Sequence, residues 1–260
     1  MTGPVLLART DGRVRHLTFN RPDALNALNR DVLAALEDEL TAAARDETIG
    51  AVLIDGTGER AFCAGADLTE LDGLDAAGAH HLLLRGQRIV AAIEELPVPV
   101  VAAVDGYALG GGFEIALACP IVLASDRSRF GLPEARLGLM PGYGGTQRLR
   151  RAVGHAPAMA LLLTGAPVDA ARAWHLGLLS APPEPPDGLA RTAADLAGEL
   201  AQLSRPTLGL ILESARSPSE GVEGLRHEAA LAALAIASGD GQEGIRSFRE
   251  KRPPLFHRPG

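Results

Sequence analysis

The stretch from residue 99 to residue 118, PVVAAVDGYALGGGFEIALA, constrains the fold more than any other part of the chain. Its apolar run at 100–104 is rich in β-branched residues and predicts a buried strand, and Asp105 and Gly106 predict a turn. Three glycines at 110–112 then leave main-chain N–H groups open to close approach by a ligand. A helix is predicted from Phe113 onward, so the glycines lie at a helix N-terminus, which favours negative charge.

The rest of the chain alternates strands and helices up to about residue 195 and is helical beyond it. Hydrophobic periodicity predicts a hairpin at 5–19, further strands at 49–54, 121–124 and 128–131, and helices that include 31–44 and 82–96. After a proline cluster, it predicts helices at 188–203, 207–215, 220–237 and 242–251. We therefore expect a mixed α/β core over residues 1–195 and a helical region over residues 196–260.

Composition and charge exclude several classes of protein. The chain has 260 residues, 47% of them hydrophobic, which is enough for one large core with an appended region. Its formal net charge of -7 argues against a sequence-independent nucleic-acid binder, because such a protein needs a basic face. The two cysteines form no disulfide framework, and neither a secretory signal nor an apolar run of roughly 20 residues is found. We therefore expect a cytoplasmic protein that binds neither membranes nor nucleic acids.

Three loops rich in small residues, CAGAD, YALGGGFE and PGYGGTQ, are interspersed with the predicted strands. Ligands of α/β proteins bind in such loops, and a nucleotide phosphate is the first candidate. A P-loop needs Gly-Lys-Ser/Thr after its glycines, whereas the single lysine of this chain is Lys251. A dinucleotide fingerprint needs the spacing G-x-G-x-x-G, which the glycines at 106 and 110–112 do not match. For a lone glycine triplet, tight packing of a strand against a helix is the alternative explanation.

Two glutamates, Glu114 and Glu134, distinguish these loops from simple packing motifs. Each lies among apolar, glycine or proline residues, where an unpaired carboxylate is unfavourable. One such glutamate alone is explained by a helix cap or by a pair with an arginine such as Arg136. Two of them, each beside a loop that exposes its backbone, indicate an acid–base pair next to an oxyanion site.

The chain resembles the enoyl-CoA hydratase/isomerase (crotonase) superfamily over essentially its whole length. The resemblance rests on seven segments, which are NRPDALNAL, AFCAGADL, PVVAAVDGYALGGGFEIALAC, FGLPEARLGLMPGYGGTQRL, LLLTG, AWHLGLL and EKRPPLF. Each segment is a weak indication alone, whereas their common order and spacing are highly specific. The resemblance implies an α/β fold, a crotonase-like spiral of ββα turns, and a helical C-terminal region that builds homotrimers or hexamers made of two trimers.

The resemblance also implies an active site for acyl-CoA thioesters. Members of the family polarise the thioester carbonyl with two backbone N–H groups, which by motif match are the amides of Ala66 and Gly111. Hydratases of the family carry both glutamates, whereas the simpler isomerases typically keep only the second. The residue that matches Glu134 is the principal acid and base, and the one that matches Glu114 orients and activates the attacking water. The amide of Gly142 matches a position that borders this water.

The contacts to coenzyme A are expected from the irregular stretch of small residues AFCAGADL at 61–68. The loop supplies three expected substrate-binding residues, namely Ala64, whose backbone matches the position that recognises adenine, and then Asp67 and Leu68. Two positions that are often lysine in hydratases are Asp23 and Thr69 here. This departure puts the phosphate and ribose contacts in question, and an arginine such as Arg21 is a candidate replacement.

The expected activity is hydration of a trans-2-enoyl-CoA to a 3-hydroxyacyl-CoA, without a metal or a separate cofactor, since coenzyme A is part of the substrate. The nearest alternative is an enoyl-CoA isomerase or another reaction of the superfamily, such as a decarboxylation. A non-catalytic member, for instance an RNA-binding or scaffold protein, is disfavoured by the acidic balance and by the two glutamates. The acyl chain length stays open, because the segments expected to line the pocket, 71–84 and 139–143, vary within the family.

Overall fold

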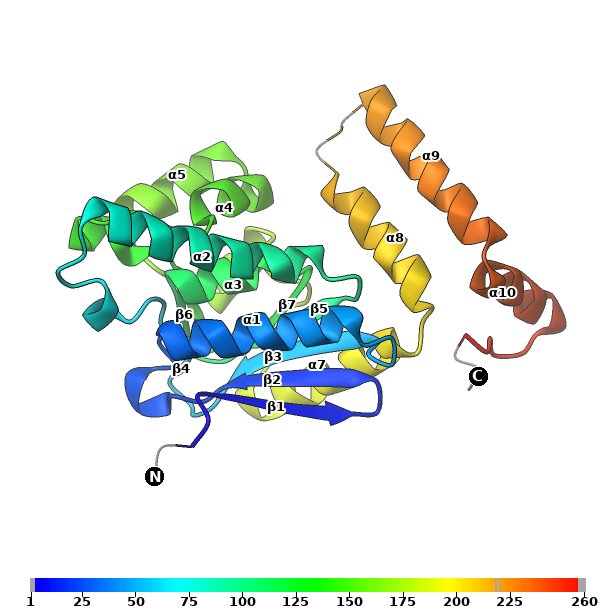
Figure 1. Ribbon diagram of the computed structural model, residues 1–260, viewed down its shortest axis with the longest axis horizontal. Coiled ribbons are helices and arrows are strands. Elements are labelled where there is room, and N and C mark those ends of the chain that lie inside the picture. The colour runs from blue at the N-terminus through cyan, green and yellow to red at the C-terminus, as the bar shows by residue number, and fades with distance from the viewer. Residues whose placement is uncertain (1–2, 218, 220, 257–260) are drawn as a thin grey trace.

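Two mixed β-sheets form the framework of the molecule (Figure 1). The computed structural model describes residues 3–217, 219 and 221–256. The larger sheet has the order β1 (Leu6–Asp11), β2 (Val14–Phe19), β3 (Ala51–Gly56), β5 (Val100–Val104) and β7 (Ile121–Ala124). The smaller sheet has the order β4 (Ala61–Cys63), β6 (Tyr107–Leu109), β8 (Arg129–Gly131) and β9 (Val168–Asp169). The pairs β1–β2 and β8–β9 are antiparallel, and the other neighbours run parallel.

From β3 to β8, successive strands alternate between the two sheets, and this alternation builds a spiral. β3 and β4 are followed by α2 (Ala76–Glu95), β5 and β6 by α3 (Gly111–Ala118), and β7 and β8 by the 3₁₀ helix η3 (Pro133–Leu137). Each turn therefore places one strand in the larger sheet and the next strand in the smaller sheet. The expected spiral of ββα turns is confirmed. Because β4, β6 and β8 run parallel, the segments that follow them leave the smaller sheet at the same edge.

The stretch at 99–118 has the predicted order of elements with one addition. β5 covers the predicted residues, and α3 begins two residues before the expected start. The short strand β6 lies between them and pairs with both β4 and β8. Sequence reasoning missed β6 because three residues beside glycines show no readable alternation of apolar and polar side chains. This strand is what carries the glycine loop to the smaller sheet.

Hydrophobic layers cover both faces of the larger sheet. On one face, Leu17 and Ile54 belong to a core that includes α1 (Arg30–Arg45) and α2. On the other face, α7 (Pro186–Ala201) presents four small or branched apolar side chains at helical spacing, Leu189, Ala193, Ala197 and Ala201. The C-terminal end of α7 lies close to the residue before β3, since a Cβ on Gly50 would lie 2.7 Å from the Ala201 carbonyl oxygen. Residue 195, the expected boundary between the two parts, lies within α7.

The remaining helices complete the core and extend from it. The helices α4 (Gly145–Val153), α5 (His155–Thr164) and α6 (Ala170–His175) follow η3 in the sequence, and Figure 1 shows α8 (Arg205–Arg216), α9 (Gly221–Ala237) and α10 (Gly239–Glu250) reaching away from the sheets. The four helices predicted after the proline cluster are present as α7 to α10, although Glu220, the first predicted residue of α9, lies outside the described residues. Among the residues that the structure describes, no helix has the length and apolarity needed to cross a membrane.

Candidate active site

A pocket with a volume of about 360 Å³ lies where the loops after β4 and β6 meet the N-terminus of α3. Its walls come from distant parts of the sequence, which are residues 24–27, residues 64–71, Leu83 on α2, the start of α3 and residues between 133 and 143. All eight residues that the sequence analysis assigned to the site line this pocket, namely Ala64, Ala66, Asp67, Leu68, Gly111, Glu114, Glu134 and Gly142. The tertiary structure thus brings the three loops of small residues to one place.

Two glycines allow the loops to meet. Gly110 has φ 49° and ψ -126°, a conformation that side chains rarely adopt, and a Cβ there would lie 2.9 Å from Oε1 of Glu134. A Cβ on Gly65, whose φ is 98°, would lie 3.2 Å from the backbone nitrogen of Gly111. The loop after β4 therefore contacts the start of α3, and the Glu134 side chain lies against the same point.

Two backbone amides that border this pocket have no hydrogen-bond acceptor among the described residues. A parallel bridge between Leu28 and Ala66 fixes the first loop, because the Leu28 amide donates to the Gly65 carbonyl (2.8 Å) and the Asp67 amide donates to the Leu28 carbonyl (2.9 Å). The Ala66 amide lies between these two bonds. In the described ranges of the chain, neither the Ala66 N–H nor the Gly111 N–H donates a hydrogen bond, and Gly111 is the first residue of α3, where helices leave N–H groups unpaired.

Glu114 is a buried carboxylate in the first turn of α3, with only 1% of its surface exposed. Its Oε1 accepts hydrogen bonds from the amides of Tyr143 (2.8 Å) and Gly145 (2.6 Å). Burial raises the pKa of Glu114 to about 7, although the two amide bonds favour the ionised form, and the charge of Glu134 raises it further. The apolar residues around Glu114 in the sequence therefore correspond to a closed space around its carboxylate.

Glu134, on η3, also lines the pocket, and within the described residues its carboxylate accepts fewer hydrogen bonds than that of Glu114. Burial raises its pKa as well. Within the part of the chain that the structure describes, its Oε2 is buried and has no hydrogen-bond partner. The alternative of a pair with Arg136 does not hold, since the Arg136 guanidinium donates to the Thr164 carbonyl oxygen (2.8 Å). An unpaired carboxyl oxygen in a pocket is free to contact a bound molecule.

One turn of α2 holds the loop that binds Glu114. The Gln87 side chain donates from Nε2 to the Gly142 carbonyl oxygen (2.9 Å). Leu83, one turn earlier, covers the same residue so closely that a Cβ on Gly142 would lie 2.4 Å from Leu83 Cδ2. Because α2 fixes this loop, the two amides that reach the Glu114 carboxylate are also fixed.

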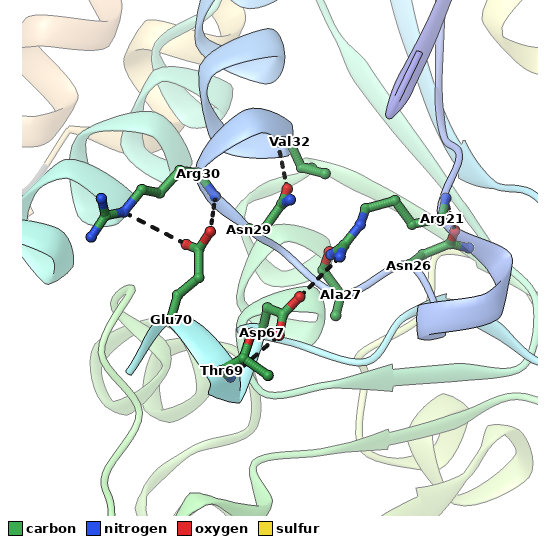
Figure 2. Close-up of polar contacts among 9 residues, drawn as sticks. All are labelled: Arg21, Asn26, Ala27, Asn29, Arg30, Val32, Asp67, Thr69 and Glu70. Carbon is green, nitrogen blue, oxygen red and sulfur yellow. Dashed lines mark hydrogen bonds and ion pairs between the residues drawn. The ribbon is translucent and has the colours of Figure 1, made fainter. Parts of the chain in front are cut away.

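An ion pair between Arg21 and Asp67 links the loop before α1 to the loop after β4 (Figure 2). Arg21 donates to Oδ2 of Asp67 (2.9 Å) and to the Ala27 carbonyl oxygen (2.6 Å), and its own amide donates to the Asn26 side chain (2.9 Å). The second oxygen of Asp67 accepts from the Thr69 hydroxyl (2.7 Å). Bonds from Thr69 and Arg21 lower the pKa of Asp67. Arg21 is thus committed to the protein, which contradicts its expected role as a replacement for a phosphate-binding lysine.

Sequence reasoning missed five residues of the lining, namely Ala24, Ala27, Gly65, Pro133 and Leu137. The first two follow from the shape of the loop after Arg21, where Leu25 (φ 51°) and Asn26 (φ 56°) adopt left-handed conformations. The buried Asn26 side chain supports this shape by donating to the carbonyl oxygens of Thr57 (3.0 Å) and Ala61 (2.8 Å). The available signal was the motif NRPDALNAL, which carried the family resemblance but no assigned role.

Fold and site together define a class of protein. Two N–H groups that are unpaired within the described residues can stabilise negative charge on a carbonyl oxygen. Two carboxyl groups, Glu114 with a pKa of about 7 and Glu134 with a raised pKa, can exchange protons. An α/β spiral with this pocket is suited to an enzyme that forms an enolate-like intermediate from a carbonyl compound.

The comparisons identify the family. The family model for enoyl-CoA hydratase/isomerase matches residues 9–259, and the chain belongs to this family. It is 42% identical over 261 residues to a Mycobacterium tuberculosis protein named probable enoyl-CoA hydratase, covering 98% of this chain and 99% of the relative. It is 36% identical over 256 residues to the crotonyl-CoA hydratase of Syntrophomonas wolfei, covering 96% and 97% of the two chains. The crystal structure of a Bacillus anthracis enoyl-CoA hydratase, 32% identical, superposes with a TM-score of 0.93 over 97% of this chain and 98% of that one.

Proposed function

We propose that this protein is an enoyl-CoA hydratase, which adds water across the α,β double bond of a trans-2-enoyl-CoA to give a 3-hydroxyacyl-CoA. The observation that carries the proposal is the presence of two carboxylates, Glu114 and Glu134, in one pocket beside the free amides of Ala66 and Gly111. In the family that the sequence resembles, hydratases carry both glutamates, whereas the simpler isomerases typically keep only the second. Relatives that are named as hydratases and align over nearly the whole chain support the same activity.

The amides of Ala66 and Gly111 would bind the thioester oxygen. When water attacks the β carbon, the electron pair of the double bond moves toward the carbonyl and negative charge accumulates on this oxygen. Fixed donors stabilise the charge without reorganising, and one such donor contributes about 3 to 4 kcal/mol in the transition state. Because Gly111 is the first residue of α3, the positive end of the helix dipole adds to the stabilisation.

The two carboxyl groups divide the work on the attacking water. Glu114 binds and orients it, since amides of the 143–145 loop fix one oxygen of this carboxylate. As the oxygen of the water bonds to the β carbon, Glu134 takes a proton from that water. A proton is then returned to the α carbon, so one water is added in total. The raised pKa values of both groups suit proton transfer near neutral pH.

The test is to incubate the protein with crotonyl-CoA in water labelled with oxygen-18 and to follow the CoA ester by mass spectrometry. We expect the product to gain one labelled water, and Glu134→Gln to reduce this rate at least about 100-fold while butanoyl-CoA still binds. Wild-type turnover in Glu134→Gln would overturn the assignment of the acid and base. Migration of the double bond of a 3-enoyl-CoA, without gain of water from any 2-enoyl-CoA, would instead indicate an isomerase.

Recognition of coenzyme A would use the backbone of Ala64 and the loop through Asp67 and Leu68, which line the same pocket. The Asp67 side chain would act indirectly, because Arg21 and Thr69 occupy both of its oxygens.

We place the protein in the cytoplasm, with support from its two free cysteines, Cys63 and Cys119, which fit a reducing compartment.

A homotrimer, or a hexamer of two trimers, is the proposed assembly. Helices α8 to α10 leave several large apolar side chains more than half exposed, namely Ile211, Val222, Leu225, Leu234, Ile236 and Phe248. Exposed apolar surface on helices that extend from the core supports association with further copies of the chain. Light scattering after size-exclusion chromatography measures the mass directly, and a monomer at micromolar concentration would refute the assembly.

A further inference from the structure

We propose that the Tyr143 side chain forms the inner wall of the acyl pocket and restricts the enzyme to short acyl chains. This inference rests on the proposed function, since it names the substrate class of the same site. Tyr143 lines the pocket and is only 3% exposed, although it lies in a loop. Its ring is held in place by a feature of α2 that has no other evident role.

That feature is Gly86, which leaves a notch in the surface of α2. A Cβ on Gly86 would lie 2.0 Å from Cε1, 2.4 Å from Cδ1 and 2.5 Å from Cζ of the Tyr143 ring. These are the three nearest atoms, so the ring fills the space that any side chain at position 86 would need. Glycine in a helix interior is unfavourable by roughly 0.5–1 kcal/mol relative to alanine, so its presence here fits a packing requirement.

The ring also lies beside the reacting groups. A Cβ on Gly111 would lie 3.1 Å from Cδ2 of the Tyr143 ring, so the ring touches the proposed oxyanion residue. The Tyr143 amide donates to Glu114, which is proposed to hold the water. The carbon atoms that react must lie between these groups, and the acyl tail begins where they end. The first carbons of the tail therefore meet the ring.

The pocket lining has a buried inner part, to which Tyr143 belongs, and an exposed outer part, and this arrangement supports Tyr143 as the inner wall. Leu137, Leu139 and Met140 line the pocket but are 57%, 46% and 72% exposed, so they form its rim. Tyr143 belongs to the inner wall together with Leu83, which packs on Gly142. A short chain fits inside this wall, whereas a longer chain must leave along the exposed rim and lose the burial of its distal carbons.

Chain-length profiles of the wild type and of Tyr143→Ala test the proposal. We measure kcat/KM for hydration of crotonyl-CoA and trans-2-decenoyl-CoA, and we expect the wild type to prefer crotonyl-CoA. The Tyr143→Ala variant should raise the ratio of decenoyl to crotonyl activity at least about tenfold, because one methylene accommodated in an apolar pocket is worth about that much. Tyr107→Ala, which removes the only other tyrosine, exposed on β6, is the matched control and should leave the ratio unchanged.

A second pair of variants tests the notch. Gly86→Ala should displace the ring and lower the unfolding temperature, whereas Gly86→Ala combined with Tyr143→Ala should lose less stability than the sum of the two single changes, because the clash is absent. An additive double variant would show that the ring does not occupy the notch.

The outcomes separate this inference from the proposed function. Hydration by the wild type with an unchanged chain-length ratio in Tyr143→Ala overturns the role of Tyr143 and leaves the hydratase proposal standing. If no enoyl-CoA is hydrated, calorimetric binding of butanoyl-CoA and decanoyl-CoA decides the matter, since these esters need no reaction. A gain in decanoyl-CoA affinity in Tyr143→Ala then supports the wall, and equal affinities in both proteins refute it.

Discussion

Replacing Glu114 by glutamine should make the folded protein more stable at alkaline pH while removing activity. Burial raises the pKa of this carboxyl group from 4.5 to about 7. The folded state therefore resists ionisation that the unfolded chain undergoes freely. Glutamine keeps the oxygen that accepts from the Tyr143 and Gly145 amides but carries no charge to bury. The substitution removes an electrostatic cost and preserves the hydrogen bonds.

The size of the effect depends on pH with a definite sign. Below pH 4.5 the carboxyl group is neutral in both states, so its burial has no ionisation cost. Between pH 4.5 and about 7 the unfolded chain releases the proton and the folded protein keeps it, so the free energy of unfolding falls as the pH rises. Above that range the cost is constant at about 3 kcal/mol, from about 1.36 kcal/mol per pKa unit.

Urea unfolding at pH 5 and pH 8, at one protein concentration, measures this difference. We expect Glu114→Gln to exceed the wild type by about 3 kcal/mol at pH 8 and by about 1 kcal/mol at pH 5. Glu47→Gln, which neutralises an exposed carboxylate between α1 and β3, is the control and should change stability by less than about 0.5 kcal/mol. If Glu114→Gln is no more stable than the wild type at pH 8, or if its advantage is the same at both pH values, burial of the Glu114 charge does not destabilise the folded protein.

Three further predictions follow from the same pocket. The logarithm of kcat/KM for hydration should fall with unit slope as the pH drops below about 7, because Glu114 must be ionised to orient the water, and a profile flat down to pH 5 would contradict this role. Asp67→Asn should weaken the ion pair with Arg21 and lower kcat about tenfold, because the Ala66 amide is then misplaced. The loss of stability in urea unfolding should be only about 1 kcal/mol. An unchanged kcat would show that the ion pair does not position the amide. Gly112→Ala should destabilise the protein by about 3 kcal/mol or more, since its Cβ would lie 2.1 Å from the Cys63 carbonyl oxygen, whereas Gly198→Ala in α7, with open space around it, should be neutral or stabilising.

Local patterns were sufficient for much of the fold. β5 coincides with the predicted strand, and the hairpin, α1 and the C-terminal helices lie where the apolar periodicity placed them. β5 is buried entirely and α1 buries one face, so the hydrophobic pattern reports both directly. β6 was missed because a three-residue strand is defined by its neighbours in the sheet. Tyr107 pairs with Ala61, 46 residues earlier, and with Arg129, 22 residues later, so no local pattern reports the strand.

The two glutamates and the glycine loops could be recognised as chemistry from the sequence, because unpaired carboxylates in apolar surroundings are unfavourable unless they have a use. The family resemblance supplied the partner amide of Ala66 and the expectation of an acyl-CoA substrate. What the chain order could not supply was the contact between segments. Nothing near Arg21 in the sequence indicates that its guanidinium is taken by Asp67, which lies 46 residues away.

The sequence by itself determined the family, the longer helices and strands and the residues able to carry acid–base chemistry, since these depend on local composition and order. Only the tertiary structure decided which groups are free and which are committed. It left the Ala66 and Gly111 amides unpaired within the described residues, paired Arg21 with Asp67, and seated the Tyr143 ring in the notch of Gly86. The physical reason is that burial, pKa and pocket shape depend on atoms brought together by folding, and no local pattern along the chain encodes those distances.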